Sequence, residues 1–282
     1  MKRSLAMGIG AFLSVATAAP LVAEACSRAV YFGKEGQIVT GRTMDWFVSD
    51  MDTNLWLYPR GLERNGNTRT PLIWKSKYGS VVTTIYEGAA ADGMNERGLV
   101  ANLLYLAESS YEPARPDDKR PTLPNSAWVQ YVLDHYATTA EAVEGLRREE
   151  FRLVPIQAPT GEPGTVHLSI SDASGDSAIF EYIDGKLRIH HGKQYQVMTN
   201  SPTFDRQLPL VDYWKEIGGS TFLPGTNRAT DRFARLSYYV NEAKQSADPR
   251  EAVATVFSLM RNVSVPIGIK IPGSQILPTR CG

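Results

Sequence analysis

The chain has 282 residues, with 30 basic and 30 acidic side chains, so its formal net charge is zero. This balance argues against nucleic acid or an anionic membrane as a partner, because both select an excess of lysine and arginine. Beyond the first 25 residues, no apolar run approaches the roughly 20 residues needed to span a bilayer. Length and composition therefore favour one large domain with a substantial core.

The first 25 residues have the three parts of a secretory signal. Two basic residues precede an apolar stretch, and small residues stand at Ala23 and Ala25. We expect residues 1–25 to be removed as a signal peptide, which leaves a single domain over residues 26–282. We therefore expect an exported protein, in the periplasm.

Cleavage after Ala25 would make Cys26 the new N-terminus. An N-terminal cysteine carries a thiol and a free α-amine, and the ordinary pKa of that amine, about 7.7 to 8.0, suits a general base. Two other interpretations stay open. A lipoprotein signal also ends in cysteine, although it favours an aliphatic residue where this chain has Ala23. A disulfide to Cys281, the one other cysteine, would block the thiol.

A β-hairpin is predicted at the start of this domain, with strands over residues 27–32 and 37–44 around a Gly-Lys-Glu-Gly turn. If the turn centres between its lysine and its glutamate, antiparallel pairing places Cys26 opposite Thr43. The residues next to Thr43 would then lie beside the new N-terminus.

The remaining strands and helices cluster separately along the chain. Strands are predicted over residues 79–86, 99–106, 165–171, 177–183, 187–191 and 195–199, and helices over residues 125–137, 226–243 and 248–262. Asn125 or Ser126 could cap the first of these helices, and Asp248 with Pro249 has the cap and first-turn proline of the last. Thr138 and Glu141 have the spacing of a capping box ahead of a further helix. This order favours a layered α+β domain with a largely antiparallel sheet over a doubly wound parallel one.

An N-terminal thiol nucleophile needs several kinds of help, and the chain has a candidate for each. The carboxylate of Asp45 can hold and polarise the amine, and the cation of Arg42 favours the thiolate. The tetrahedral intermediate needs a donor for its oxyanion, which Asn200 can supply from the end of a predicted strand. Arg232, in the first turns of a predicted helix, can steady this network.

Six segments of the domain carry a resemblance to a known family. They are Cys26-Ser27-Arg28, Gly41-Arg42-Thr43-Met44-Asp45-Trp46, Asp92-Gly93-Met94-Asn95-Glu96-Arg97-Gly98-Leu99, Val197-Met198-Thr199-Asn200-Ser201-Pro202, Arg232-Phe233-Ala234-Arg235 and Val263-Ser264-Val265-Pro266-Ile267-Gly268. In this order they resemble the choloylglycine hydrolase family of N-terminal-nucleophile hydrolases, which includes penicillin V acylases and conjugated bile salt hydrolases. The resemblance implies an αββα sandwich, a cysteine nucleophile and hydrolysis of a linear amide bond.

The resemblance also assigns site residues. The family's catalytic positions fall on Cys26, Arg42, Asp45, Asn200 and Arg232. A further oxyanion position, asparagine or tyrosine in the family, falls on Tyr105, with Asn102 as a rival because the chain departs from the pattern there. Met44, Trp46 and Phe47 flank these positions and are candidates for binding the acyl group. Ordinary core packing is the alternative for each of these three.

The export signal makes the chain similar to the Gram-negative branch of the family, which is associated with penicillin V and with N-acyl homoserine lactones. We therefore predict a small-molecule amide substrate of that kind, with conjugated bile salts as the alternative. The family resemblance also implies a homotetramer. The competing class of function is an exported binding protein or lipoprotein that keeps the fold without catalysis.

Serine or metal chemistry accounts for the sequence less well. The four histidines accompany no Gly-x-Ser-x-Gly motif. His190 and His191 are adjacent on a predicted strand, so their side chains point to opposite faces and are poorly placed to share an ion. We expect neither a metal nor another cofactor.

Overall fold

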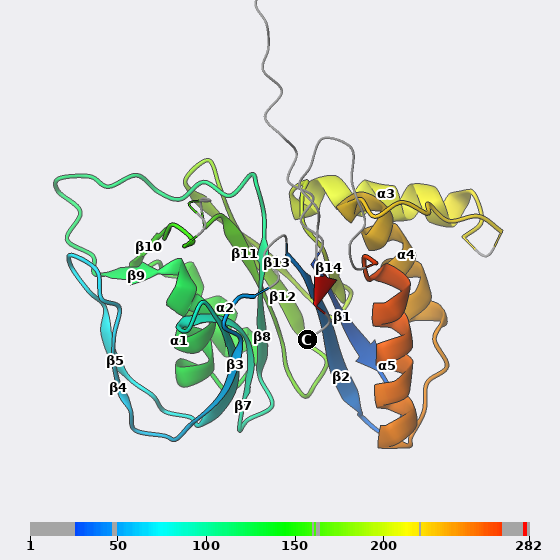
Figure 1. The fold of residues 1–282 in the computed structure, drawn as a ribbon, viewed down its shortest axis with the longest axis horizontal. Coiled ribbons are helices and arrows are strands. Elements are labelled where there is room, and N and C mark those ends of the chain that lie inside the picture. The colour runs from blue at the N-terminus through cyan, green and yellow to red at the C-terminus, as the bar shows by residue number, and fades with distance from the viewer. Residues whose placement is uncertain are drawn as a thin grey trace, which may run out of the picture.

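The computed structural model describes residues 26–46, 50–159, 161, 164–219, 221–266 and, for the backbone alone, 279–280. The predicted signal peptide, Phe47 and Cys281 therefore lie outside the described residues. Figure 1 shows the described part as two sheets packed face to face between two groups of helices.

The larger sheet has seven strands, and every neighbouring pair in it is antiparallel. In spatial order they are β13 (Lys186–His191), β12 (Ser177–Ile183), β11 (Val166–Ser171), β8 (Val100–Tyr105), β7 (Ala89–Asn95), β6 (Ser80–Ile85) and β3 (Asn54–Tyr58). The smaller antiparallel sheet consists of β14 (Val197–Met198), β1 (Ser27–Phe32), β2 (Ile38–Asp45) and β15 (Thr279–Arg280).

Helices cover the outer face of each sheet, which confirms the expected αββα sandwich (Figure 1). On the seven-stranded sheet lie α1 (Trp128–His135), preceded by the single turn η1 (Asn125–Ala127), and α2 (Thr139–Arg147). On the four-stranded sheet lie α4 (Ala229–Glu242) and α5 (Pro249–Val263), with α3 (Phe204–Glu216) packed on α4. Two small ribbons, β4 (Glu63–Asn65) with β5 (Ile73–Lys75) and β9 (Thr122–Pro124) with the parallel β10 (Arg152–Val154), complete the described part. None of the helices in the described ranges is long and apolar enough to cross a membrane.

The N-terminal hairpin is present, but its predicted register was wrong by one residue. Ser27, not Cys26, pairs with Thr43. The reason is the turn, in which five residues separate Phe32 from Ile38 and the centre falls on Glu35. Glu35 has a φ of 56°, in the left-handed region, which lets the odd-numbered turn close.

The first predicted helix begins at Trp128, after the single turn η1 and without a side-chain cap, and the helix expected from residue 226 begins at Ala229. Two helix starts predicted from capping residues are confirmed. The side chain of Thr138 accepts a hydrogen bond from the Glu141 N–H at 3.2 Å, and Asp248 caps α5 ahead of Pro249. The prediction missed α3, β3, β7, β15 and the four strands of the two small ribbons. α3 contains Pro209, and β7 contains a glycine, residues that ordinarily argue against these elements.

Candidate active site

Cys26 directly precedes β1, with its side chain buried and its thiol free. From the neighbouring strand β2, Arg42 reaches the sulfur with Nη2, 3.7 Å from Sγ. The same guanidinium makes an ion pair with Asp92 on β7 and donates to the Leu103 carbonyl at 3.1 Å. The hairpin therefore places one cation against the thiol, and the facing sheet holds that cation in position.

Burial and the neighbouring charges shift the pKa values of Cys26 and Arg42 in opposite directions. Burial raises the pKa of the Cys26 thiol above its usual range, and Arg42 offsets part of this rise. Burial alone would lower the pKa of Arg42, but Asp92 and the cysteine outweigh it and raise that pKa. Arg42 is thus a permanent cation that favours the thiolate once a base removes the proton.

Asn200 and Arg232 meet at the backbone of Cys26. The Cys26 N–H donates to Asn200 Oδ1 at 2.7 Å, and Arg232 Nη2 donates to the same oxygen at 2.9 Å. Arg232 Nη1 also donates to the Cys26 carbonyl and to Ser27 Oγ, each at 2.6 Å. Asn200 Nδ2 donates to the Tyr105 carbonyl at 2.8 Å. Asn200 thus holds the Cys26 nitrogen, while Arg232 on α4 and the Tyr105 carbonyl on β8 hold Asn200.

Asp45, the last residue of β2, is completely buried. Within the described residues neither carboxylate oxygen accepts a hydrogen bond of good geometry. Burial raises the pKa of Asp45 to about 7, although Arg232, Arg42 and the nearby Val265 N–H hold it down in part. Burial thus outweighs these neighbours, and the negative charge of Asp45 is only partly compensated.

The structure separates the two rivals for the further oxyanion position. Tyr105 ends β8 and lines the cavity that contains Cys26. Asn102 is buried, is not among the residues lining that cavity, and donates from Nδ2 to Asp92 at 2.8 Å. Asn102 thus supports the carboxylate that holds Arg42, whereas Tyr105 faces the space where a substrate would lie.

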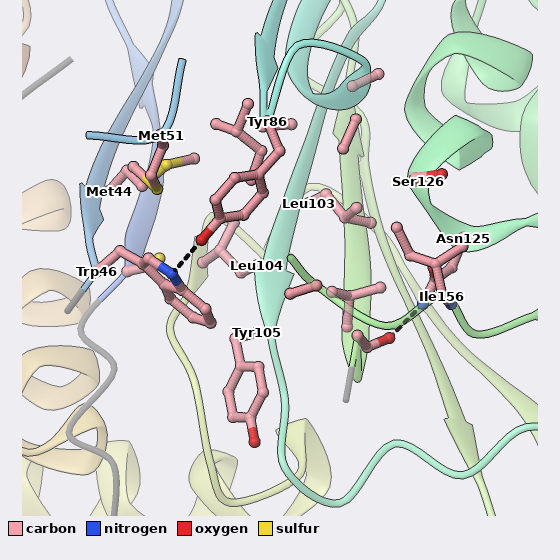
Figure 2. Close-up of a pocket in the computed structure, with 18 of the residues that line it drawn as sticks. Met44, Trp46, Met51, Tyr86, Leu103, Leu104, Tyr105, Asn125, Ser126 and Ile156 are labelled. Carbon is pink, nitrogen blue, oxygen red and sulfur yellow. Dashed lines mark hydrogen bonds between the residues drawn. The ribbon is translucent and has the colours of Figure 1, made fainter. Parts of the chain in front are cut away.

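The cavity beside Cys26 has a volume of about 360 Å³ and is mostly apolar. Met44 and Trp46 line it as expected, while Phe47 is outside the described residues. Figure 2 shows Trp46 and Tyr86 at one side, joined by a hydrogen bond of 2.7 Å from the indole N–H to the phenol oxygen, and Ile156 at the other side. These walls suit an apolar group attached to a reacting carbonyl.

Sequence reasoning missed several contributors to this site. Asp92 begins the third of the six segments quoted above, but nothing local marked it as the partner of Arg42. Met51 and Ile156 come from loops whose sequences show no periodic pattern, and Tyr86 directly follows β6, at the end of a predicted strand that carried no signal for a binding role. Their side chains become neighbours only because the two sheets pack together.

The described residues contain no group of three or more histidine, cysteine, aspartate or glutamate side chains that could hold a metal ion. The two adjacent histidines have separate surroundings. His191 Nε2 lies 2.7 Å from Asp176 Oδ2, while the His190 ring packs against Phe204.

Comparison with known proteins agrees with this geometry. The family described as linear amide C-N hydrolases, choloylglycine hydrolase family, matches residues 26–275. The penicillin V acylase of Pectobacterium atrosepticum is 48% identical over 272 residues, which cover 89% of this chain and 72% of the relative.

Two solved structures are similar in fold. The penicillin V acylase of Agrobacterium tumefaciens superposes with a TM-score of 0.82 at 55% identity, covering 90% of this chain and 78% of that one. A variant of the conjugated bile acid hydrolase of Clostridium perfringens superposes with a TM-score of 0.76 at 23% identity, covering 90% and 84%. The site geometry and these matches together establish that the chain belongs to the choloylglycine hydrolase family of linear amide C–N hydrolases.

Proposed function

We propose that this chain is an exported acylase of the penicillin V type, in which Cys26 becomes the N-terminal nucleophile when residues 1–25 are removed. Similarity to two penicillin V acylases at 48% and 55% identity supports the reaction class. The family match that begins at Cys26 supports the cleavage point.

The observation that carries the proposal is the surroundings of the Cys26 nitrogen. That nitrogen is buried against Asn200 Oδ1, and the Asp45 carboxylate, whose oxygens lack a hydrogen bond of good geometry in the described residues, acts electrostatically on the thiol of the same cysteine. An uncut chain offers only one neutral N–H there. A freed α-ammonium would bring a positive charge and further donors to the same place, and would add to the partial stabilisation that Arg232, Arg42 and the Val265 N–H give the Asp45 carboxylate.

The reaction then follows from atoms already close together. The neutral α-amine of Cys26 takes the thiol proton, and the sulfur attacks the amide carbonyl carbon while Arg42 stabilises the thiolate. Asn200 has a second amide N–H beyond the one bound to the Tyr105 carbonyl, and we assign it with Tyr105 to the developing oxyanion. The protonated amine gives its proton to the leaving nitrogen as the C–N bond breaks.

The resulting thioester is hydrolysed by water. The amine, neutral again, removes a proton from that water, whose oxygen attacks the acyl carbon. The C–S bond breaks, the carboxylic acid leaves and the thiol is restored. Asn200, which Arg232 fixes, accepts from the amine, and Asp45 supplies a negative charge for its protonated form through both steps.

The apolar cavity favours a substrate with an apolar acyl group, such as the phenoxyacetyl group of penicillin V or the fatty acyl group of an N-acyl homoserine lactone. Conjugated bile salts are the alternative, with bulkier acyl groups. We also propose a periplasmic location and a homotetramer, in line with the family resemblance.

Two measurements on exported protein test the proposal. Intact mass is expected to show loss of residues 1–25 and a free Cys26 thiol, whereas a diacylglyceryl adduct or a bridge to Cys281 would contradict it. Rates with penicillin V, a long-chain N-acyl homoserine lactone and glycocholate, measured side by side, rank the three substrates.

Replacing the nucleophile gives the decisive variant. Cys26→Ser is expected to lose the release of phenoxyacetate by at least about 10³-fold, because a hydroxyl is a far weaker nucleophile at neutral pH. Circular dichroism checks that the variant is folded and mass spectrometry that it is trimmed. A folded, trimmed variant with full activity would mean that the protein uses another nucleophile.

A further inference from the structure

The segment that carries Asn200 has little sheet structure to hold it. β14 pairs with β1 only at Val197 and Met198, so the ladder ends two residues before Asn200. The chain then turns and enters α3 at Phe204. The position of the Asn200 amide must therefore depend on other contacts.

A buried histidine and glutamate on the facing sheet supply two of these contacts. His167 on β11 and Glu181 on β12 are both completely buried, with His167 Nδ1 2.9 Å from Glu181 Oε1. His167 Nε2 lies 2.8 Å from the carbonyl oxygen of Thr199, the residue before Asn200. The Glu181 oxygens accept the Phe204 N–H at 3.0 and 3.1 Å.

These contacts restrict where the protons lie. The Thr199 carbonyl can only accept, so His167 must carry a proton on Nε2. One further proton is shared between Nδ1 and Glu181, which leaves the buried pair neutral overall whichever atom holds it. The Thr203 side chain does not cap α3, so Glu181 accepts the hydrogen bond from the first N–H of that helix.

Gln207 on α3 holds the same segment from its other side. Its Nε2 donates to the Asn200 carbonyl at 2.7 Å and to the Pro202 carbonyl at 2.6 Å, and its Oε1 accepts from Thr199 Oγ1 at 2.8 Å. All of its polar atoms are used on this segment, and it is completely buried. The backbone on both sides of Asn200 is thus fixed by side chains that do not line the cavity.

We propose that the His167–Glu181 pair, together with Gln207, positions Asn200 for catalysis. The inference rests on the role proposed above for Asn200. The pair anchors the carbonyl before Asn200 and the N–H at the start of α3, so the amide stays aligned with the Cys26 nitrogen and with the Tyr105 carbonyl. Displacements of about 1 Å in such a group cost on the order of 10²-fold in rate.

The test compares variants that remove or keep the donor to Thr199. His167→Leu removes it and is expected to lower kcat by about 30-fold with little change in KM, because the cavity that binds the acyl group is untouched. His167→Gln can keep an N–H near the Nε2 position, and Glu181→Gln keeps an acceptor for Phe204. Both are expected to retain kcat within about threefold.

A matched control separates positioning from general weakening of the fold. Asp134→Ala removes an equally buried polar side chain that binds Trp74 and Gln130 on the far side of the seven-stranded sheet. It is expected to lower the thermal midpoint without changing kcat below that midpoint. If His167→Leu does not fold, Gln207→Met tests the same segment from α3, and the expected loss of kcat is similar.

A double-mutant cycle gives the sharpest outcome. Asn200→Ala alone is expected to lower kcat by about 10²- to 10³-fold, and His167→Leu should cost little more in that background. Full activity of Asn200→Ala would overturn the proposed role of Asn200 itself. Three results would overturn the positioning role alone. The first is a large loss of kcat in Asn200→Ala with normal kcat in His167→Leu. The others are equal losses in His167→Leu and His167→Gln, or strictly additive losses in the double variant.

Discussion

On β11, Leu168 and Ile170 face α1 and α2, whereas His167 and Ser171 face the four-stranded sheet. We call the layer between the seven-stranded sheet and helices α1 and α2 the outer layer. It is a continuous apolar core around Trp128, held by non-directional burial. The inner layer, between the two sheets, contains apolar side chains such as Leu104 and Ile179 and also many directional polar contacts. Alternation of this kind is typical of a strand with one face in water, but here both faces are buried.

The difference between the two layers shows that the reactive groups lie in the polar inner layer. Arg28 illustrates the inner layer, since its buried guanidinium donates to the Ile170 and Tyr195 carbonyls and makes no ion pair within the described residues. Burial lowers its pKa to about 9. Buried polar groups in this layer must keep one arrangement to satisfy their hydrogen bonds, and this fixes the positions of the site residues at the edge of the layer. The outer layer supplies stability and tolerates changes of shape more readily.

The largest effect is expected from breaking the inner layer at Arg42. Arg42→Leu leaves Asp92 without its ion-pair partner and the thiolate without its cation. We expect kcat to fall by about 10³-fold and the free energy of unfolding to fall by about 3 kcal/mol. Steady-state kinetics and urea unfolding measure the two losses. Arg42→Lys keeps the charge but not the forked geometry, and should fall between wild type and Arg42→Leu.

The matching change in the outer layer should separate stability from catalysis. Leu133 on α1 is completely buried against the seven-stranded sheet, near Gly93. Leu133→Ala is expected to cost about 3 kcal/mol of unfolding free energy through the cavity it leaves, with kcat unchanged at temperatures where the protein is folded. A proportional drop in kcat would show that the two layers are not independent.

A smaller effect is expected on how the free energy of unfolding changes with pH, in uncut and in trimmed protein. The folded pKa of Asp45, about 7, lies above its unfolded value, so the folded uncut chain binds the proton more tightly. Its free energy of unfolding should therefore fall as pH rises from about 4 to about 7. In trimmed protein the new ammonium lowers that pKa, and the slope should flatten.

Urea unfolding across this pH range checks the difference. The uncut form is obtained by replacing Ala23 and Ala25 with leucine to block cleavage. Asp45→Asn in the uncut chain serves as the control and should remove the slope. Identical slopes in uncut and trimmed protein would contradict the proposed pairing of Asp45 with the α-amine.

The smallest effect is expected at the cavity wall. Tyr86→Phe removes the hydrogen-bond partner of the Trp46 indole without changing the apolar surface much. We expect KM to rise by a few fold, about 1 kcal/mol, with kcat nearly constant. A change in kcat with constant KM would instead connect Trp46 to the reacting groups.

Several local features of this protein followed from sequence patterns alone. The turn residues after Phe32 predicted the hairpin, and the caps at Thr138 and Asp248 predicted where two helices begin. Each depends on residues within a few positions of one another, where backbone geometry and hydrogen bonding are local. The hairpin also brought Arg42 close to Cys26, because only one turn separates them.

Tertiary structure decided what surrounds those two residues. Asn200 and Arg232 reach the Cys26 backbone across 174 and 206 positions of the chain, and Asp92 reaches Arg42 from the facing sheet. No periodicity encodes such distances, since they depend on how two sheets stack and on which strand follows which. The same holds for His167 and Glu181, whose role depends on a segment that lies beside them only in the folded chain.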